Sequence, residues 1–79
     1  MSKRVTTAKI ITAAEIIGER TGTTPYVVLL NATVWGDPVR YCELMATAGN
    51  LFTSVTPDSP TFQRALEQTR RAHNARQVA

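Results

Sequence analysis

The sequence has a single cysteine and no long apolar run, and each shortage excludes a class of protein. Cys42 is the only cysteine among 79 residues, so an internal disulfide and a multi-cysteine metal site are both excluded. Because it lies in an apolar-rich run from Val39 to Met45, we expect it to be buried and structural. No run approaches the roughly 20 apolar residues that cross a bilayer, and the N-terminal residues lack the apolar core of a signal peptide. We therefore expect a cytoplasmic protein with no membrane partner.

Residues that carry catalysis are also scarce. His73 is the only histidine, and no serine or cysteine stands at motif spacing from it. The chain contains no nucleophile elbow, no phosphate-binding loop and no zinc-protease pattern. The six acidic residues are scattered, and Asp37 and Asp58 look like cap or turn residues. The sequence therefore predicts a protein that is not an enzyme and needs no cofactor or metal.

Length and aromatic content place the chain near the lower limit for independent folding. Residues 1–79 make one helical domain, with a flexible N-terminus at 1–6 and a basic C-terminal helix at 60–79. The chain has only five aromatic residues. A domain of this size buries only about 60 to 65 per cent of its unfolded surface. A homo-oligomer or a protein partner would supply further buried area, and we expect one of them.

Capping residues predict an all-α fold, a small bundle of about four short helices. The first helix ends at Gly22, because glycine accepts the left-handed conformation that follows a helix. We expect it to begin near Thr7, where apolar residues first show helical spacing. Two alternatives remain open: a later start at Thr12, through a capping-box pattern over residues 12–15, and an extended conformation for residues 4–11.

Each of the other three helices is expected to start at a proline that follows a capping residue. The three pairs are Thr24-Pro25, Asp37-Pro38 and Ser59-Pro60. The run from Val27 to Leu30 is apolar on every side, which favours a buried helix, although it also suits a strand. The second and third helices are expected at the centre of the bundle.

Apolar spacing also suggests which faces of the last two helices point inward. The candidates in the third helix, over residues 39–48, are Val39, Cys42, Leu44, Met45 and Ala48. Those in the fourth are Phe62, Ala65, Leu66, Thr69 and Ala72.

The positive charge is concentrated near the C-terminus. Residues 1–59 carry five basic and five acidic side chains, whereas residues 60–79 carry four arginines against Glu67 alone. These arginines are Arg64, Arg70, Arg71 and Arg76. A basic segment of this kind can engage phosphates or an acidic protein face, and it equally suits a solvated helix face.

Residues 12–31, and chiefly the stretch from Ile17 to Val28, resemble the helix-turn-helix family. Ile17 and Gly18 stand where an aliphatic and a small residue let two helices approach, and Gly22 stands in the turn. Thr21 departs from the pattern, because an apolar residue is usual there. The resemblance implies a small DNA-binding protein of bacterial or phage type with a regulatory role, whose partner is double-stranded DNA.

The same resemblance implies which residues would meet DNA. The groove-facing candidates near the start of the second helix are Thr23, Thr24, Tyr26 and Val27. None of them can make a bidentate contact with a base, so specific readout would be weak. Phosphate contacts would come from Arg20, Arg40, Arg64, Arg70, Arg71 and Arg76.

Residues 35–48, which open with Trp35-Gly36-Asp37-Pro38, resemble part of the LysM-like modules of tailed-phage tail and baseplate proteins. This resemblance implies a structural role in a virion. The alternative to DNA binding is therefore a non-enzymatic assembly or interaction module, such as a virion component or a small inhibitor or adaptor. Its partner would cover Leu29, Leu30 and Trp35. Burial of Leu29 and Leu30 inside the monomer would prevent the second helix from presenting that face to a DNA groove.

Overall fold

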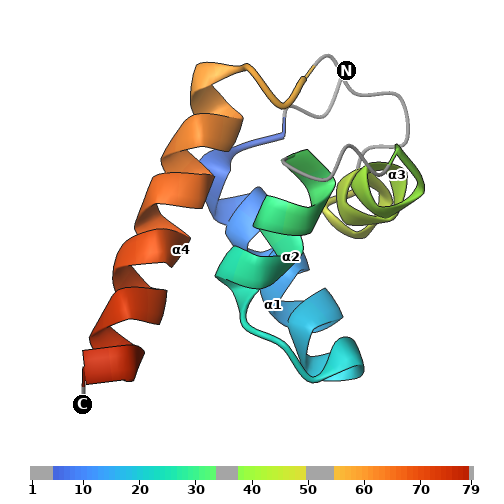
Figure 1. The fold of residues 1–79 in the computed structure, drawn as a ribbon. Helices are drawn as coiled ribbons and strands as arrows, with labels where there is room; N and C mark the ends of the chain where they lie inside the picture. Colours follow the sequence, from blue (N-terminus) through green and yellow to red (C-terminus); the bar gives the residue numbers. More distant parts are fainter. Residues whose placement is uncertain (1–4, 34–37, 50–54, 79) are drawn as a thin grey trace.

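Capping residues and prolines mark out four α-helices in the part of the chain that the structure describes. The computed structural model describes residues 5–33, 38–49 and 55–78. The helices are α1 (Thr7–Thr21), α2 (Pro25–Thr33), α3 (Pro38–Thr47) and α4 (Pro60–Val78), which confirms the predicted all-α fold (Figure 1). α1 and α2 pack against each other, and each also contacts α3 and α4. The central pair is therefore α1 and α2, not the second and third helices as the sequence suggested.

Apolar side chains spaced three or four residues apart supply the core. α1 contributes Ile10, Ala13, Ala14 and Ile17. The largest fully buried side chains of the described residues are Phe62, Ile10, Ile17, Leu29, Leu44 and Met45. Burial of each contributes about 1.5 to 3 kcal/mol. Val5, which precedes α1, is also buried, so the flexible segment expected at 1–6 does not extend to it.

α1 starts at Thr7, as expected, with Thr6 as its cap. The Thr6 side chain accepts a hydrogen bond from the backbone N–H of Lys9 at 3.2 Å, and the backbone of Thr6 is extended. Thr12 lies inside the helix, so the alternative start at the capping-box pattern over residues 12–15 is wrong. The extended alternative is also wrong for residues 7–11. The earlier start brings Ile10 into the core, which the later start would have left outside the helix.

A tight glycine turn connects α1 to α2. Gly22 adopts the left-handed conformation with φ 74°, and its N–H donates to the Gly18 carbonyl. The N–H of Thr23 donates to the same carbonyl at 2.9 Å. A Cβ atom added at Gly18 would lie 2.7 Å from the Thr23 carbonyl oxygen, so only glycine fits at this contact without a backbone shift. The turn therefore depends on glycine at two positions for two different reasons.

α2 is a helix rather than a strand. Thr24 caps it, because its side chain accepts from the N–H of Val27 at 3.4 Å and its carbonyl accepts from the N–H of Val28 at 3.2 Å. The inward face consists of Val28, Leu29 and Ala32, all at most 3 % exposed. Packing between two neighbouring helices thus settles the ambiguity of an apolar run that the sequence left open.

α3 turns a different face inward from the one the sequence suggested. Tyr41, Leu44, Met45 and Ala48 pack in or against the core, which is one stripe of helical spacing. Val39 is 76 % exposed and Cys42 is exposed, so the prediction that both are buried is wrong. The Tyr41 hydroxyl donates to the Val55 carbonyl and so ties this stripe to the segment that precedes α4.

α4 is capped as predicted and is the longest helix. The N–H of Phe62 donates to the Ser59 side chain at 3.2 Å. Phe62, Ala65 and Thr69 are buried, but Ala72 is exposed, so the inward stripe ends one turn earlier than expected. None of the helices in the described part of the chain is both long and apolar enough to cross a membrane.

Candidate nucleic-acid interface

The start of α2, where the sequence placed groove-facing residues, is partly used for internal contacts. Thr24 Oγ1 lies 3.0 Å from Nδ1 of His73 on α4. The rings of Tyr26 and His73 are 5.3 Å apart and tilted by 45°. Thr23 is exposed, whereas Thr24, Tyr26 and Val27 are half-buried. Of the four candidates, only Thr23 is exposed, and its hydroxyl lies 3.2 Å from that of Thr21.

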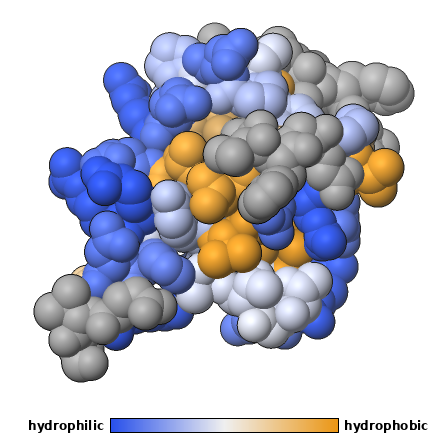
Figure 2. Space-filling model, in the orientation of Figure 1, coloured by the Kyte–Doolittle hydropathy of each residue, from blue (hydrophilic) through white to orange (hydrophobic). Residues whose placement is uncertain are grey.

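The rest of α2 is mostly apolar and carries no charge. Leu29 is fully buried within the hydrophobic core of the molecule, so its predicted role in a protein interface is wrong. Leu30 is half-buried. Trp35, the third predicted interface residue, lies outside the described residues. Figure 2 shows hydrophobic side chains gathered over the middle of the molecule, beside the hydrophilic surface of α4. α2 therefore offers no cation to a phosphate.

Two of the predicted phosphate-binding arginines share one carboxylate. Arg20 on α1 lies 4.0 Å from the Glu43 carboxylate, and Arg40 on α3 lies 3.6 Å from it. Both pairs are largely open to solvent, so each contributes about 0 to 1 kcal/mol. Their positive charge is offset locally, which weakens the attraction of this side of the molecule for an anion.

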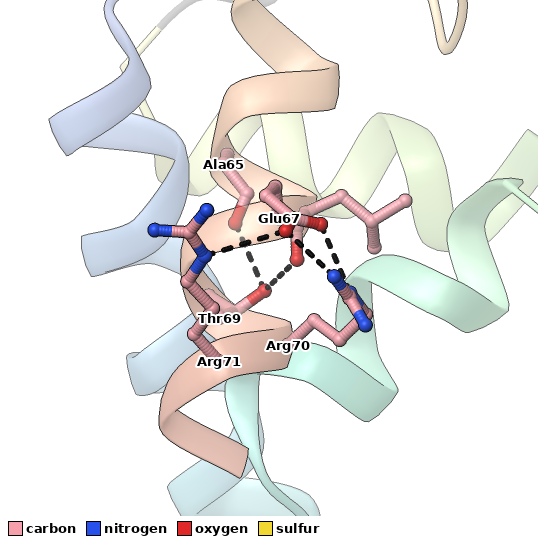
Figure 3. Close-up of polar contacts among 6 residues, drawn as sticks. Ala65, Glu67, Thr69, Arg70 and Arg71 are labelled. Carbon is pink, nitrogen blue, oxygen red and sulfur yellow. Dashed lines mark hydrogen bonds and ion pairs between the residues drawn. The ribbon is translucent and has the colours of Figure 1, made fainter. Parts of the chain in front are cut away.

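Arg70 and Arg71 share a second carboxylate on the surface of α4. Arg70 donates from Nε and Nη2 to the two oxygens of Glu67 at 2.9 and 2.6 Å, and Arg71 donates from Nε at 3.3 Å. Figure 3 shows the two guanidinium groups on either side of the Glu67 carboxylate. The hydrogen bonds from Arg70 lower the pKa of Glu67 below its usual range, and those to Glu67 raise the pKa of Arg70. Glu67 therefore remains charged and holds both arginines.

Arg64 and Arg76 make no ion pair among the described residues, but they lie on different faces of α4. Arg64 and Arg71 are seven residues apart, or almost two full turns, so they share a face. That face lies opposite the stripe of Phe62, Ala65 and Thr69 that packs into the core. Arg76 follows Thr69 by seven residues and so lies on the same side of α4 as the buried stripe, but beyond its end. It lines a groove with Glu15 of α1.

The outward face of α4 thus carries Arg64 and Arg71, and Glu67 joins Arg71 to Arg70 on the flank of the helix. We call this set the α4 arginine cluster. The arginines are predicted from the sequence but the role of Glu67 is not, although carboxylates three and four residues from an arginine are a readable helix signal. It also missed His73, whose partner is 49 residues away. No sequence signal could have indicated that contact.

Within the described parts of the chain, no three His, Cys, Asp or Glu side chains are arranged to hold a metal ion. Comparisons with known proteins add no functional assignment. No protein family matches this chain, and no curated protein or solved structure matches it either.

Proposed function

We propose that the chain is a small DNA-binding protein of the helix-turn-helix type and that the α4 arginine cluster makes its main contacts with the duplex. One observation supports this proposal above the others: Arg64 and Arg71 share the face of α4 that points away from the core, and Glu67 joins Arg71 to the exposed Arg70 on the flank of the helix. Residues 60–79 also carry the whole net charge of +3. Arginines in such an array contact phosphates, and they attract a duplex before it docks.

The proposed mode of binding is phosphate contact rather than base readout. α2 has no charged side chain, and its first turn is held by His73. Acidic Glu15 and Glu19 are exposed on α1, and Glu15 lines a groove on the core-facing side of α4, away from the arginine cluster. The net charge of +2 on the α4 arginine cluster therefore lies apart from these carboxylates, which favours the approach of a polyanion to the outward side of α4. Such binding tolerates different base sequences and weakens with salt.

Glu67 competes with phosphate for two of the three arginines. A phosphate that binds Arg70 or Arg71 has to replace hydrogen bonds of 2.6 to 3.3 Å to the Glu67 carboxylate. Removal of this carboxylate should therefore strengthen DNA binding. Three engaged arginines give a slope of about −2.7 in a plot of log affinity against log salt, and competition from Glu67 makes the slope of the natural chain shallower.

The experiment compares Glu67→Gln with Glu43→Gln by fluorescence anisotropy on a mixed-sequence duplex at several salt concentrations. Both substitutions change the net charge by the same amount, and each removes a carboxylate held by two arginines. We expect Glu67→Gln to bind several-fold tighter with a slope steeper by about one, and Glu43→Gln to change affinity much less. Arg64→Ala and Arg71→Ala should each make the slope shallower by about one, whereas Arg20→Ala should not.

Three results would contradict the proposal. The first is no binding at low salt, and the second is binding that does not respond to salt. The third is an equal effect of Glu67→Gln and Glu43→Gln, because equal effects would mean that only the total charge matters.

A second function, a non-enzymatic interaction or assembly module, is favoured by the uncharged surface of α2. Val27 and Leu30 are half-buried rather than fully enclosed, although both are apolar. A second copy of the chain packed on α2 would cover them. Light scattering over a range of protein concentrations tests this function: we expect dimers that Leu30→Glu disrupts, while Val39→Glu on α3 leaves them intact. A monomer at all concentrations would rule out self-association.

A further inference from the structure

A groove between α1 and α4 is separate from the α4 arginine cluster. Its volume is about 180 Å³, and its walls include Ile11 and Glu15 of α1 and Ala72 and Arg76 of α4. Pro25, at the start of α2, also lines the groove. Because one water molecule takes about 30 Å³ of liquid volume, the groove has room for a molecule of several heavy atoms.

Opposite charges enter this groove from its two walls. Glu15 and Arg76 both line it, yet neither makes an ion pair within 4.0 Å among the described residues. A ligand with only a carboxylate would satisfy Arg76 and be repelled by Glu15, and a ligand with only an amine would face the reverse. A ligand that carries both groups matches both walls.

Thr69 adds a polar acceptor to the wall of the groove. It is 5 % exposed, the only buried polar residue found in the described part of the chain. Its hydroxyl shares its one proton between the carbonyls of Ala65 and Leu66, each at 2.9 Å (Figure 3). The lone pairs of the oxygen remain able to accept a hydrogen bond from an N–H group. The other polar pair on the lining, Thr24 and His73, is already joined at 3.0 Å.

We infer that this groove binds a small zwitterion of the amino-acid class. The carboxylate of the ligand pairs with Arg76, and its ammonium group meets Glu15 and the Thr69 oxygen. An aliphatic side chain lies against Ile11, Pro25 and Ala72. This inference does not depend on DNA binding, because none of these residues belongs to the α4 arginine cluster.

The test titrates the full chain with L-leucine and follows two-dimensional NMR spectra. We expect saturable shifts at residues 11–15 and 69–76, with a dissociation constant in the millimolar range that suits so small a ligand. Two analogues serve as matched controls. Leucine amide lacks the carboxylate and 4-methylpentanoate lacks the ammonium group, and each should bind at least about fivefold more weakly than leucine.

Two substitutions assign the charged contacts. Arg76→Gln should weaken leucine at least about fivefold and leave leucine amide unchanged, whereas Glu15→Gln should weaken leucine and leave 4-methylpentanoate at least as tight. Arg64→Gln, which makes the same change on the outward face, should affect none of the three ligands. Circular dichroism confirms that each variant remains folded, since all three positions are exposed.

The inference is overturned by any of three results. Absence of saturable shifts up to about 50 mM leucine excludes a site of the expected strength. Equal binding of 4-methylpentanoate and leucine shows that Glu15 and Thr69 do not recognise an ammonium group. Unchanged leucine binding in Arg76→Gln shows that the carboxylate lies elsewhere.

Discussion

Replacement of Gly18 by alanine tests whether the close approach of α1 to the following turn determines stability. A Cβ atom at this position would lie 2.7 Å from the Thr23 carbonyl oxygen, which is backbone and cannot rotate away like a side chain. The turn cannot shift freely either. Its N–H at Thr23 is bonded to the Gly18 carbonyl at 2.9 Å, and Gly22 is fixed in the left-handed region.

The expected size follows from three contributions. Overpacking of this kind costs about 1 to 3 kcal/mol. Weakening of the hydrogen bond from Thr23 adds about 1 kcal/mol, and the better helix propensity of alanine returns about 1 kcal/mol. The free energy of unfolding should therefore fall by about 2 kcal/mol, which lowers Tm by about 8 to 16 °C in a domain of this size.

Thermal and urea unfolding followed by circular dichroism measure this change. Thr12, an exposed residue in the middle of the same helix, provides the calibration, because the difference between Thr12→Ala and Thr12→Gly gives the propensity contribution without a clash. If Gly18→Ala were as stable as the natural chain, or more stable, the argument for a close approach would fail.

Four further predictions concern the core, the hydrogen bond from Tyr41 to Val55, the surface charges and the thiol of Cys42. Phe62→Ala should destabilise the fold by about 3 to 5 kcal/mol in urea unfolding, because the ring is fully buried. Tyr41→Phe should cost about 1 kcal/mol in the same assay, since it removes the bond to the Val55 carbonyl. The lowered pKa of Glu67 means that its stabilising effect is present above its ordinary value of 4.5 and is lost as the pH falls through the lower folded pKa. Stability measured over this acidic window should thus fall less in Glu67→Gln than in the natural chain. Cys42 is exposed, so a thiol reagent should label it fully without denaturant.

Each of these four has a result that contradicts it. Phe62→Ala within about 1 kcal/mol of the natural chain would mean that the site collapses without a cavity. An unchanged Tyr41→Phe would mean that water replaces the lost bond. Parallel acid profiles for Glu67→Gln and the natural chain would remove the argument for a stabilising ion pair. If labelling of Cys42 required urea, the Cys42 side chain would be buried on the inner face of α3, as the sequence predicted.

Local signals predicted the helices well because capping and proline chemistry act within a few residues. Thr24 and Ser59 were both expected as caps, and both accept hydrogen bonds from the helices that follow them. The faces of α3 were harder, because Val39 and Cys42 are as apolar as the residues that are buried. Which stripe points inward depends on where α1 and α2 lie, and this information is not local.

In the candidate site, too, contacts within one helix could be predicted from the sequence, whereas contacts between helices could not. The arginines of α4 are visible as an uneven charge distribution, and the pairing of Glu67 with Arg70 follows from helix spacing. The pairing of Arg20 with Glu43 joins two different helices and could not be predicted from spacing. The contact of His73 with Thr24 and Tyr26 also joins different parts of the chain and could not be predicted from spacing. Because of this contact, neither Thr24 nor Tyr26 is fully exposed at the start of α2.

The contact between Thr24 and His73 has a consequence for deletion mapping. Because the two residues are far apart in sequence, a chain shortened before residue 73 would lose a partner of the glycine turn along with the end of α4. Loss of activity in such a shortened chain could then result from a change at the start of α2 as well as from the absence of Arg76. Point substitutions at separate positions, rather than nested deletions, are the means of assigning function to each end of this molecule.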